Sequence, residues 1–174
     1  ILKQPIWEPA NLLFWKKKEA QKSDVSNAVN NGFLSFIRGN FFIPDPKIFW
    51  VNSSVKFLHQ YLKENKVDVV ISTGPPHSVH LIAQKLKQKT NIKWIADFRD
   101  PWSNLYYNEE FKQLSFAKKK NEKLENSVFK NADCILTVSN SLKKEFDQKA
   151  TRVEVITNGF DDEVVTNTLI TLDE

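Results

Sequence analysis

The feature that most constrains this chain is an alternation of helix-like and strand-like patterns after about residue 52. Apolar residues recur at helical spacing over 52–65, from Ser78 onward, and over 111–130 and 140–146. Between them lie short apolar or β-branched runs at 67–71, 92–98, 134–138 and 153–156. Strands that alternate with helices imply right-handed crossovers. The sequence therefore predicts an α/β fold with a doubly wound parallel sheet.

The same patterns divide the chain. The strand-like runs are mostly continuous in hydrophobicity, which is typical of strands covered on both faces. Asn52 or Ser53 is expected to cap the first helix of this part. We predict an irregular, aromatic-rich leader at 1–51 packed on a Rossmann-like domain at 52–158, followed by a linker at 159–174.

Composition excludes several classes of protein. With 41% hydrophobic and 26% charged residues, the chain is typical of soluble globular proteins. The net charge of +4 follows lysines along the expected helices, and arginine is scarce, so we do not expect nucleic-acid binding. One cysteine, Cys134, forms neither an internal disulfide nor a zinc site, and it suits the cytoplasm. The absence of Met indicates a piece of a longer protein.

Polar residues follow every expected strand. In open parallel sheets, ligands bind beyond the carboxyl ends of the strands. We therefore expect these residues to converge on one rim and to form the site. The segments are Ser72–Ser78, Asp97–Trp102, Ser139–Ser141 and Thr157–Asp161.

The first of these segments precedes a helix whose first amides face the rim. Such a terminus favours an anion or a sugar hydroxyl. The alternative is a rigid turn in which His77 caps the helix, and both interpretations remain open. The candidate substrate-binding residues are Gly74, Pro75, His77, Ser78, Ser139 and Asn158.

The second segment carries three charges at the end of a buried strand. Asp97, Arg99 and Asp100 can orient vicinal hydroxyls or a phosphate through fork-like hydrogen bonds, so we take them as candidate catalytic residues. The alternative is an internal Asp–Arg pair that holds the loop closed, with Trp102 as its hydrophobic plug. The clustering of charges favours the site.

The leader mixes aromatic residues with lysines, at 12–18 and again over 33–50. That mixture occurs at membrane interfaces, so a peripheral contact with the inner face of a membrane stays open. Packing of these aromatics on the domain is the alternative. We favour packing, because proline and glycine interrupt any long amphipathic helix.

The ordered strand-end segments resemble the amino-terminal domain of family 4 glycosyltransferases, which have the two-domain GT-B architecture. The resemblance covers roughly residues 37–161, and the stretch 37–45 is similar to a subgroup of bacterial members. Each piece alone is weakly specific, whereas the ordered series is more specific. The pieces are Asp68–Ser78, Trp94–Trp102, Asn131–Asp133, Thr137–Ser139 and Val155–Asp161.

The resemblance implies retaining transfer of a sugar from a nucleotide sugar to an acceptor, without a metal or other cofactor. It also implies that this domain holds a sugar or lipid-linked acceptor, and that a carboxyl-terminal domain holds the nucleotide. Many members have a His after the strand matched by Trp94–Phe98. Arg99 stands closest to that place, but a guanidinium stays charged and differs from a neutral partner. Gly159 is the expected hinge between the domains.

Two features of the family are missing. None of the four glycines lies in a glycine-rich loop near an expected first strand, and no Glu has another Glu eight positions on. We therefore expect an incomplete amino-terminal half of a GT-B enzyme that is inactive alone. The alternative is a non-catalytic α/β binding or scaffold domain.

Overall fold

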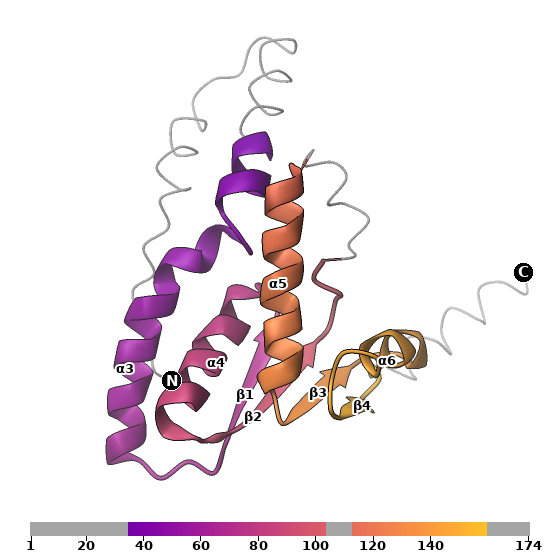
Figure 1. The fold of residues 1–174 in the computed structure, drawn as a ribbon. Helices are drawn as coiled ribbons and strands as arrows, with labels where there is room; N and C mark the ends of the chain where they lie inside the picture. Colours follow the sequence, from indigo (N-terminus) through magenta and orange to yellow (C-terminus); the bar gives the residue numbers. More distant parts are fainter. Residues whose placement is uncertain (1–34, 104–112, 160–174) are drawn as a thin grey trace, which may run out of the picture.

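The structure is a computed structural model that describes residues 35–103 and 113–159 (Figure 1). Its helices and strands alternate from the first long helix onward, as the sequence predicts. The elements are η2 (Pro46–Trp50), α3 (Val51–Glu64), β1 (Val69–Gly74), α4 (Ser78–Thr90), β2 (Lys93–Phe98), α5 (Ser115–Asn131), β3 (Cys134–Thr137), α6 (Asn140–Phe146) and β4 (Val153–Val155).

The strands form one parallel sheet in the order β1-β2-β3-β4. Its register places Ser72 beside Ala96, and Ala96 beside Ile135. All carboxyl ends therefore point to the same edge of the sheet. The prediction of an α/β fold with a parallel, Rossmann-like sheet is confirmed.

The three crossover helices, α4, α5 and α6, lie over one face of this sheet, and α3 packs on α4. Each crossover steps in the same direction, and right-handed connections of that kind place their helices on the same side. Figure 1 shows α4 and α5 across the strands. On the covered face Trp94 and Phe98 are fully buried, whereas Val69 and Ile71 on the other face are exposed. The second helix layer of a doubly wound sheet is not among the described residues.

The core lies between the sheet and these helices, and stacked rings fill it. Phe98 in β2 stacks on the His80 ring at 4.5 Å and on the Phe129 ring at 5.0 Å. Phe146 from α6 completes the group, with its ring 4.9 Å from that of Phe129. Three helices are thus fixed to the end of β2, which is the strand that leads into the candidate catalytic residues.

The start of α3 differs from the sequence prediction. We expected Asn52 or Ser53 to cap this helix, and that was wrong. The helix begins at Val51 as a continuation of η2, with Trp50 as its N-cap, so both residues lie in its first turn. The Ser53 hydroxyl donates to the Trp50 carbonyl instead. By contrast, Ser139 does cap α6, and its side chain accepts from the Leu142 amide.

The described end of the leader is more regular than we expected. Residues 35–41 are helical, and η2 follows them. Ile43 is buried, and Ile48 and Trp50 pack against the core, while Phe41 and Phe49 are exposed. Residues 1–34, and all of the expected linker except Gly159, lie outside the described residues.

Candidate functional site

The Arg99 side chain joins two separate strand ends at the carboxyl edge of the sheet. Its Nε lies 3.3 Å from Asp97 Oδ2, and its Nη1 donates to Asn158 Oδ1 at 2.6 Å. Asp97 alternates along β2 with buried residues, so it belongs to the face that the helices leave open. We call Asp97, Arg99 and Asn158 the rim cluster.

The rim cluster combines a mostly buried carboxylate with an exposed guanidinium. The Arg99 side chain is 52% exposed and that of Asp97 14%. A guanidinium carries five N–H donors, and the two bonds above leave others for a ligand. Asp100 follows directly and is exposed. The arrangement suits hydrogen bonding to hydroxyl or phosphate oxygens.

His77 lies under the loop that follows β2. Its ring stacks on Trp102 at 5.0 Å with an interplanar angle of 6°. Burial lowers the pKa of His77 to about 4. Burial, together with repulsion from His77, lowers the pKa of His80 to about 3. Both rings are therefore neutral at pH 7. Both His77 ring nitrogens and His80 Nε2 lack a hydrogen-bond partner among the described residues.

The amino terminus of α4, where an anion or a sugar hydroxyl was one of two open interpretations, holds a carboxylate of the same chain. Asp45 Oδ2 accepts from the Ser78 amide at 2.7 Å, and Oδ1 accepts from the Ser78 hydroxyl at 2.9 Å. Oδ1 also accepts from the Lys47 amide, so Asp45 caps η2 as well. His77 is the N-cap residue of α4, as the alternative interpretation expected, although its side chain makes no capping hydrogen bond.

The loop after β2 is held from α5. Glu125 is buried, and its carboxylate accepts from the Trp102 amide at 3.2 Å and from the Ser103 amide at 3.1 Å. The Trp102 indole N–H donates to Asn121 Oδ1 at 3.0 Å. Trp102 is thus a fixed plug between His77 and α5. No local sequence pattern indicated these roles of Asp45 and Glu125, because their partners lie 33 and 22 to 23 residues away.

A comparison with known protein families decides the family of this chain. The family model described as Glycosyltransferase Family 4 matches residues 20–164, which is most of the chain. The chain belongs to glycosyltransferase family 4. The match spans every described strand and the whole rim cluster. No curated protein and no solved structure matches the chain.

In this family 4 chain, the predicted site residues divide between the two faces of the sheet. The rim cluster stands on the open face. Gly74, His77 and Ser78 are buried on the helix side, and Pro75 is exposed. Among the described residues, no hydrogen bond joins Ser78 or Ser139 to the rim cluster. Side-chain hydrogen bonds therefore join three of the predicted residues, and the Arg99 amide also donates to the Gly74 carbonyl at 3.3 Å. The roles of all the predicted residues stay predictions.

Gly74 and Gly159 of this glycosyltransferase chain differ in their surroundings. A Cβ at Gly74 would lie 2.6 Å from His80 Nε2, so the backbone approaches the ring as only glycine permits. A Cβ at Gly159 would meet nothing within 4 Å, and no described glycine has a positive φ. The expected hinge at Gly159 thus has no steric requirement for glycine in this conformation.

A hollow of about 370 Å³ lies at the opposite edge of the sheet, by the amino ends of β1 and β2. It is far from the strand ends where ligands of open α/β sheets bind, so we do not assign the reaction to it. Within the described ranges, no group of three or more His, Cys, Asp or Glu side chains could hold a metal ion. The hollow is lined by His59, Leu62, Lys63, Val67, Asp68, Thr90, Asn91, Ile92 and Lys93.

Proposed function

We propose that this domain forms the acceptor side of a cleft in which a sugar passes from a nucleotide sugar to an acceptor. The family match supports sugar transfer. The observation that carries the location is the rim cluster, in which Arg99 links Asp97 to Asn158 at the carboxyl edge of the sheet. Residues from separate strands meet there in the geometry that binds ligands in open α/β sheets.

The rim cluster suits this role because its groups are already oriented. The hydrogen bond that Arg99 donates to Asp97 holds the guanidinium in place, so less conformational freedom is lost when a ligand binds. Arg99 then donates to a hydroxyl or phosphate oxygen, Asp97 and the exposed Asp100 accept from sugar hydroxyls, and Asn158 orients Arg99 from the far strand.

The proposal extends to the missing half of the reaction. Because the chain has neither the glycine-rich loop nor the paired Glu motif, a second domain holds the nucleotide sugar, and these 174 residues alone do not turn it over. We further propose retention of configuration, a hexosyl donor, no metal, a sugar or lipid-linked acceptor, and a cytoplasmic location. Gly159 lies at the hinge.

The test compares two arginine–carboxylate pairs in the full-length enzyme, each between residues two positions apart. Arg99 pairs with Asp97, two residues away, at the rim, and Arg152 pairs with Glu154, two residues away, on β4. Arg99→Ala and Asp97→Ala should each lower kcat/KM about 10- to 100-fold, the loss expected for a charged hydrogen bond. Arg152→Ala should change kcat/KM less than about twofold.

Release of nucleotide from a panel of UDP-, GDP- and ADP-sugars gives the readout, and thermal melting checks the fold of each variant. Full activity in both rim variants would place the site elsewhere. Loss of folding in both would show that the pair holds the loop closed instead. Robust turnover by the 174-residue chain itself would contradict the need for a second domain.

A further inference from the structure

Three large apolar side chains stand exposed where the helical stretch 35–41 meets the start of α5. Phe41 is 65% exposed and Phe116 is 50% exposed, with their ring centroids 6.2 Å apart. Leu114, two residues before Phe116, is also exposed. We call Phe41, Leu114 and Phe116 the aromatic patch. Grouped apolar side chains on a surface, unlike scattered ones, mark a site of interaction.

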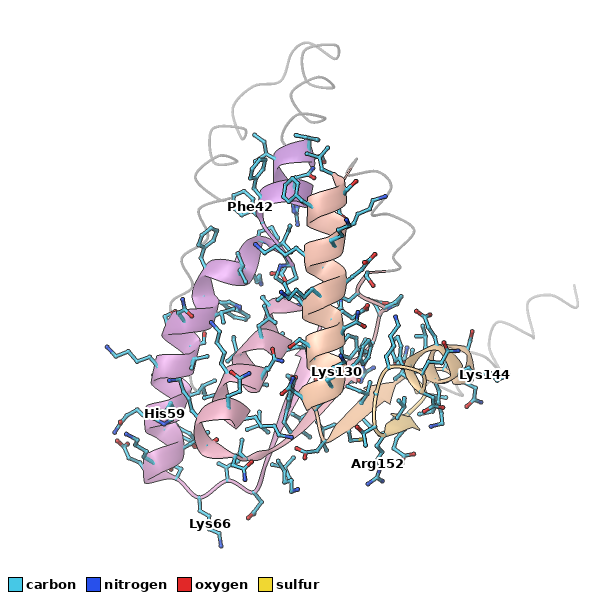
Figure 2. The ribbon with its side chains drawn as sticks, in the orientation of Figure 1. Phe42, His59, Lys66, Lys130, Lys144 and Arg152 are labelled. Carbon is cyan, nitrogen blue, oxygen red and sulfur yellow. The ribbon has the colours of Figure 1, made fainter. Side chains whose placement is uncertain are left out.

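The aromatic patch is a built surface, because partly buried hydrogen bonds join its two segments. Asn40 is 1% exposed, and its Oδ1 accepts from the Leu114 amide at 2.6 Å. Its Nδ2 donates to the Phe36 carbonyl, and Gln113 donates to the Gly39 carbonyl. These bonds fix together segments that lie 74 residues apart in the sequence. The two segments lie side by side at one end of the molecule, near the Phe42 label (Figure 2).

The border of the aromatic patch is strongly basic. Arg38 lies one turn before Phe41, and Lys118–Lys120 follow Phe116 along the first turns of α5. All four side chains are exposed, and none forms an ion pair with another described residue. The stretches 35–44 and 113–121 contain no Asp or Glu. The nearest acidic residue along α5 is the exposed Glu122, so positive charge still exceeds negative charge along this border.

We propose that the aromatic patch and its basic border dock this domain on an anionic lipid surface. Aromatic rings favour the boundary between headgroups and acyl chains, and lysine and arginine beside them are attracted to anionic headgroups. A second copy of the chain fits this surface less well, because a twofold contact would bring the basic border of one copy against that of the other. Docking in this way is peripheral, and no helix in the described ranges is long and apolar enough to cross a bilayer.

The position of the aromatic patch gives docking a consequence for the reaction. Helices α4 and α5 run opposite to the parallel strands, so their amino termini and the carboxyl ends of the strands lie at the same end (Figure 1). Docking would therefore hold the edge with the rim cluster toward the bilayer, within reach of a lipid-linked acceptor. This consequence rests on the proposed function, whereas docking itself does not.

The test measures co-sedimentation of the 174-residue protein with vesicles, without any sugar nucleotide. Vesicles of phosphatidylcholine with about 30% phosphatidylglycerol should bind it about tenfold or more tightly than phosphatidylcholine alone at about 0.1 M salt, and about 0.5 M salt should abolish the difference. Lys118→Glu/Lys119→Glu/Lys120→Glu should lose this binding. Its control has the same net charge and changes three exposed lysines elsewhere, as Lys66→Glu/Lys89→Glu/Lys130→Glu.

The apolar contribution to vesicle binding is tested with a second variant and its matched control. Phe41→Ser/Phe116→Ser should weaken vesicle binding about tenfold or more, whereas Ile71→Ser/Ile156→Ser, at two side chains that are each 61% exposed, should not. Melting curves confirm that each variant folds. Equal binding to neutral and anionic vesicles, or equal losses in the two charge variants, would overturn the proposal. A dimer would also overturn it, if light scattering detected the dimer, if Phe41→Ser/Phe116→Ser alone dissociated it, and if it bound no vesicles.

Discussion

The two faces of the sheet carry similar residues but have different surroundings. On the helix face, Trp94, Ala96 and Phe98 are completely buried. On the open face, Ile71 of β1 is 61% exposed. Both sets are apolar, so hydrophobicity alone does not tell which face a helix covers. What decides it is the strand order, because right-handed crossovers that all step one way place their helices on one side.

The difference between the two faces also separates the residues that stabilise the fold from the candidate ligand-binding residues. The helix face holds the stacked rings and the buried His77 and His80, whose partners are mostly other core groups. The open face and its edge hold Arg99, whose side chain is 52% exposed, and Asp97, whose side chain is 14% exposed. We therefore expect substitutions on the helix face to affect folding, and substitutions at the rim cluster to affect ligand binding.

The largest expected effect is on the helix face. Phe98→Ala should lower the free energy of unfolding by about 3–5 kcal/mol, since it removes a fully buried ring and leaves a cavity among His80, Phe129 and Phe146. Denaturant titration measures the change. The control is Phe57→Ala, at a ring that is 40% exposed on α3. If the two variants lose the same free energy, the helix face is not the main source of stability.

The next effect depends on pH. His77 is neutral in the folded protein down to a pKa of about 4, whereas in the unfolded chain it binds a proton below about 6.5. Above pH 6.5 His77 is neutral in both states and does not destabilise the fold. As the pH falls from 6.5 toward 4, only the unfolded chain takes up the proton, so the free energy of unfolding decreases. The loss is on the order of 3 kcal/mol.

Unfolding titrations at several pH values test this, with His77→Phe as the comparison. Phenylalanine can still stack on Trp102 but takes up no proton, so the stability of this variant should fall less between pH 6.5 and 4 than that of the wild type. Carboxylates contribute equally to both curves and cancel in the difference. Parallel curves for the two proteins would contradict the prediction.

A smaller effect is expected where the backbone approaches the buried rings. Gly74→Ala should cost about 1–3 kcal/mol, because the new methyl group would lie 2.6 Å from His80 Nε2 and the stacked ring has little room to move. Gly159→Ala is the matched control, and with nothing within 4 Å it should be neutral or slightly stabilising. Similar costs at both glycines would show that His80 moves freely.

The order of the elements could be predicted from the sequence because it depends on local periodicity. Strands β1 to β4 and helices α3 to α6 appear where apolar spacing places them. Their limits are less predictable. The strand-like run was expected at 67–71, but β1 continues through Gly74, because Thr73 and Gly74 pair with Asp97 and Phe98 of the neighbouring strand.

From the sequence, only those features of the candidate site that follow from the strand topology were predictable. Parallel strands bring their carboxyl ends to one edge, which is why Arg99 and Asn158 were both candidates. The bond between them joins residues 59 positions apart, and no local pattern encodes it. The same holds for Asp45, which lies 33 residues before Ser78 and accepts from its amide at the start of α4. One of the two open interpretations had an anion or a sugar hydroxyl at this place.

The smallest expected change in the free energy of unfolding is on the open face, and it tests the comparison of the two sheet faces most directly. Ile71→Ser should change the free energy of unfolding by no more than about 0.5 kcal/mol, because the side chain is already mostly in water. Ala96→Ser is the matched change on the helix face of the neighbouring strand. It should cost about 1–3 kcal/mol, because it buries a hydroxyl where alanine is fully enclosed. A cost above about 1.5 kcal/mol for Ile71→Ser would mean that this face is covered in solution. Repeating the measurement over a range of protein concentrations would then show whether a second copy covers it, since only self-association makes the cost depend on concentration.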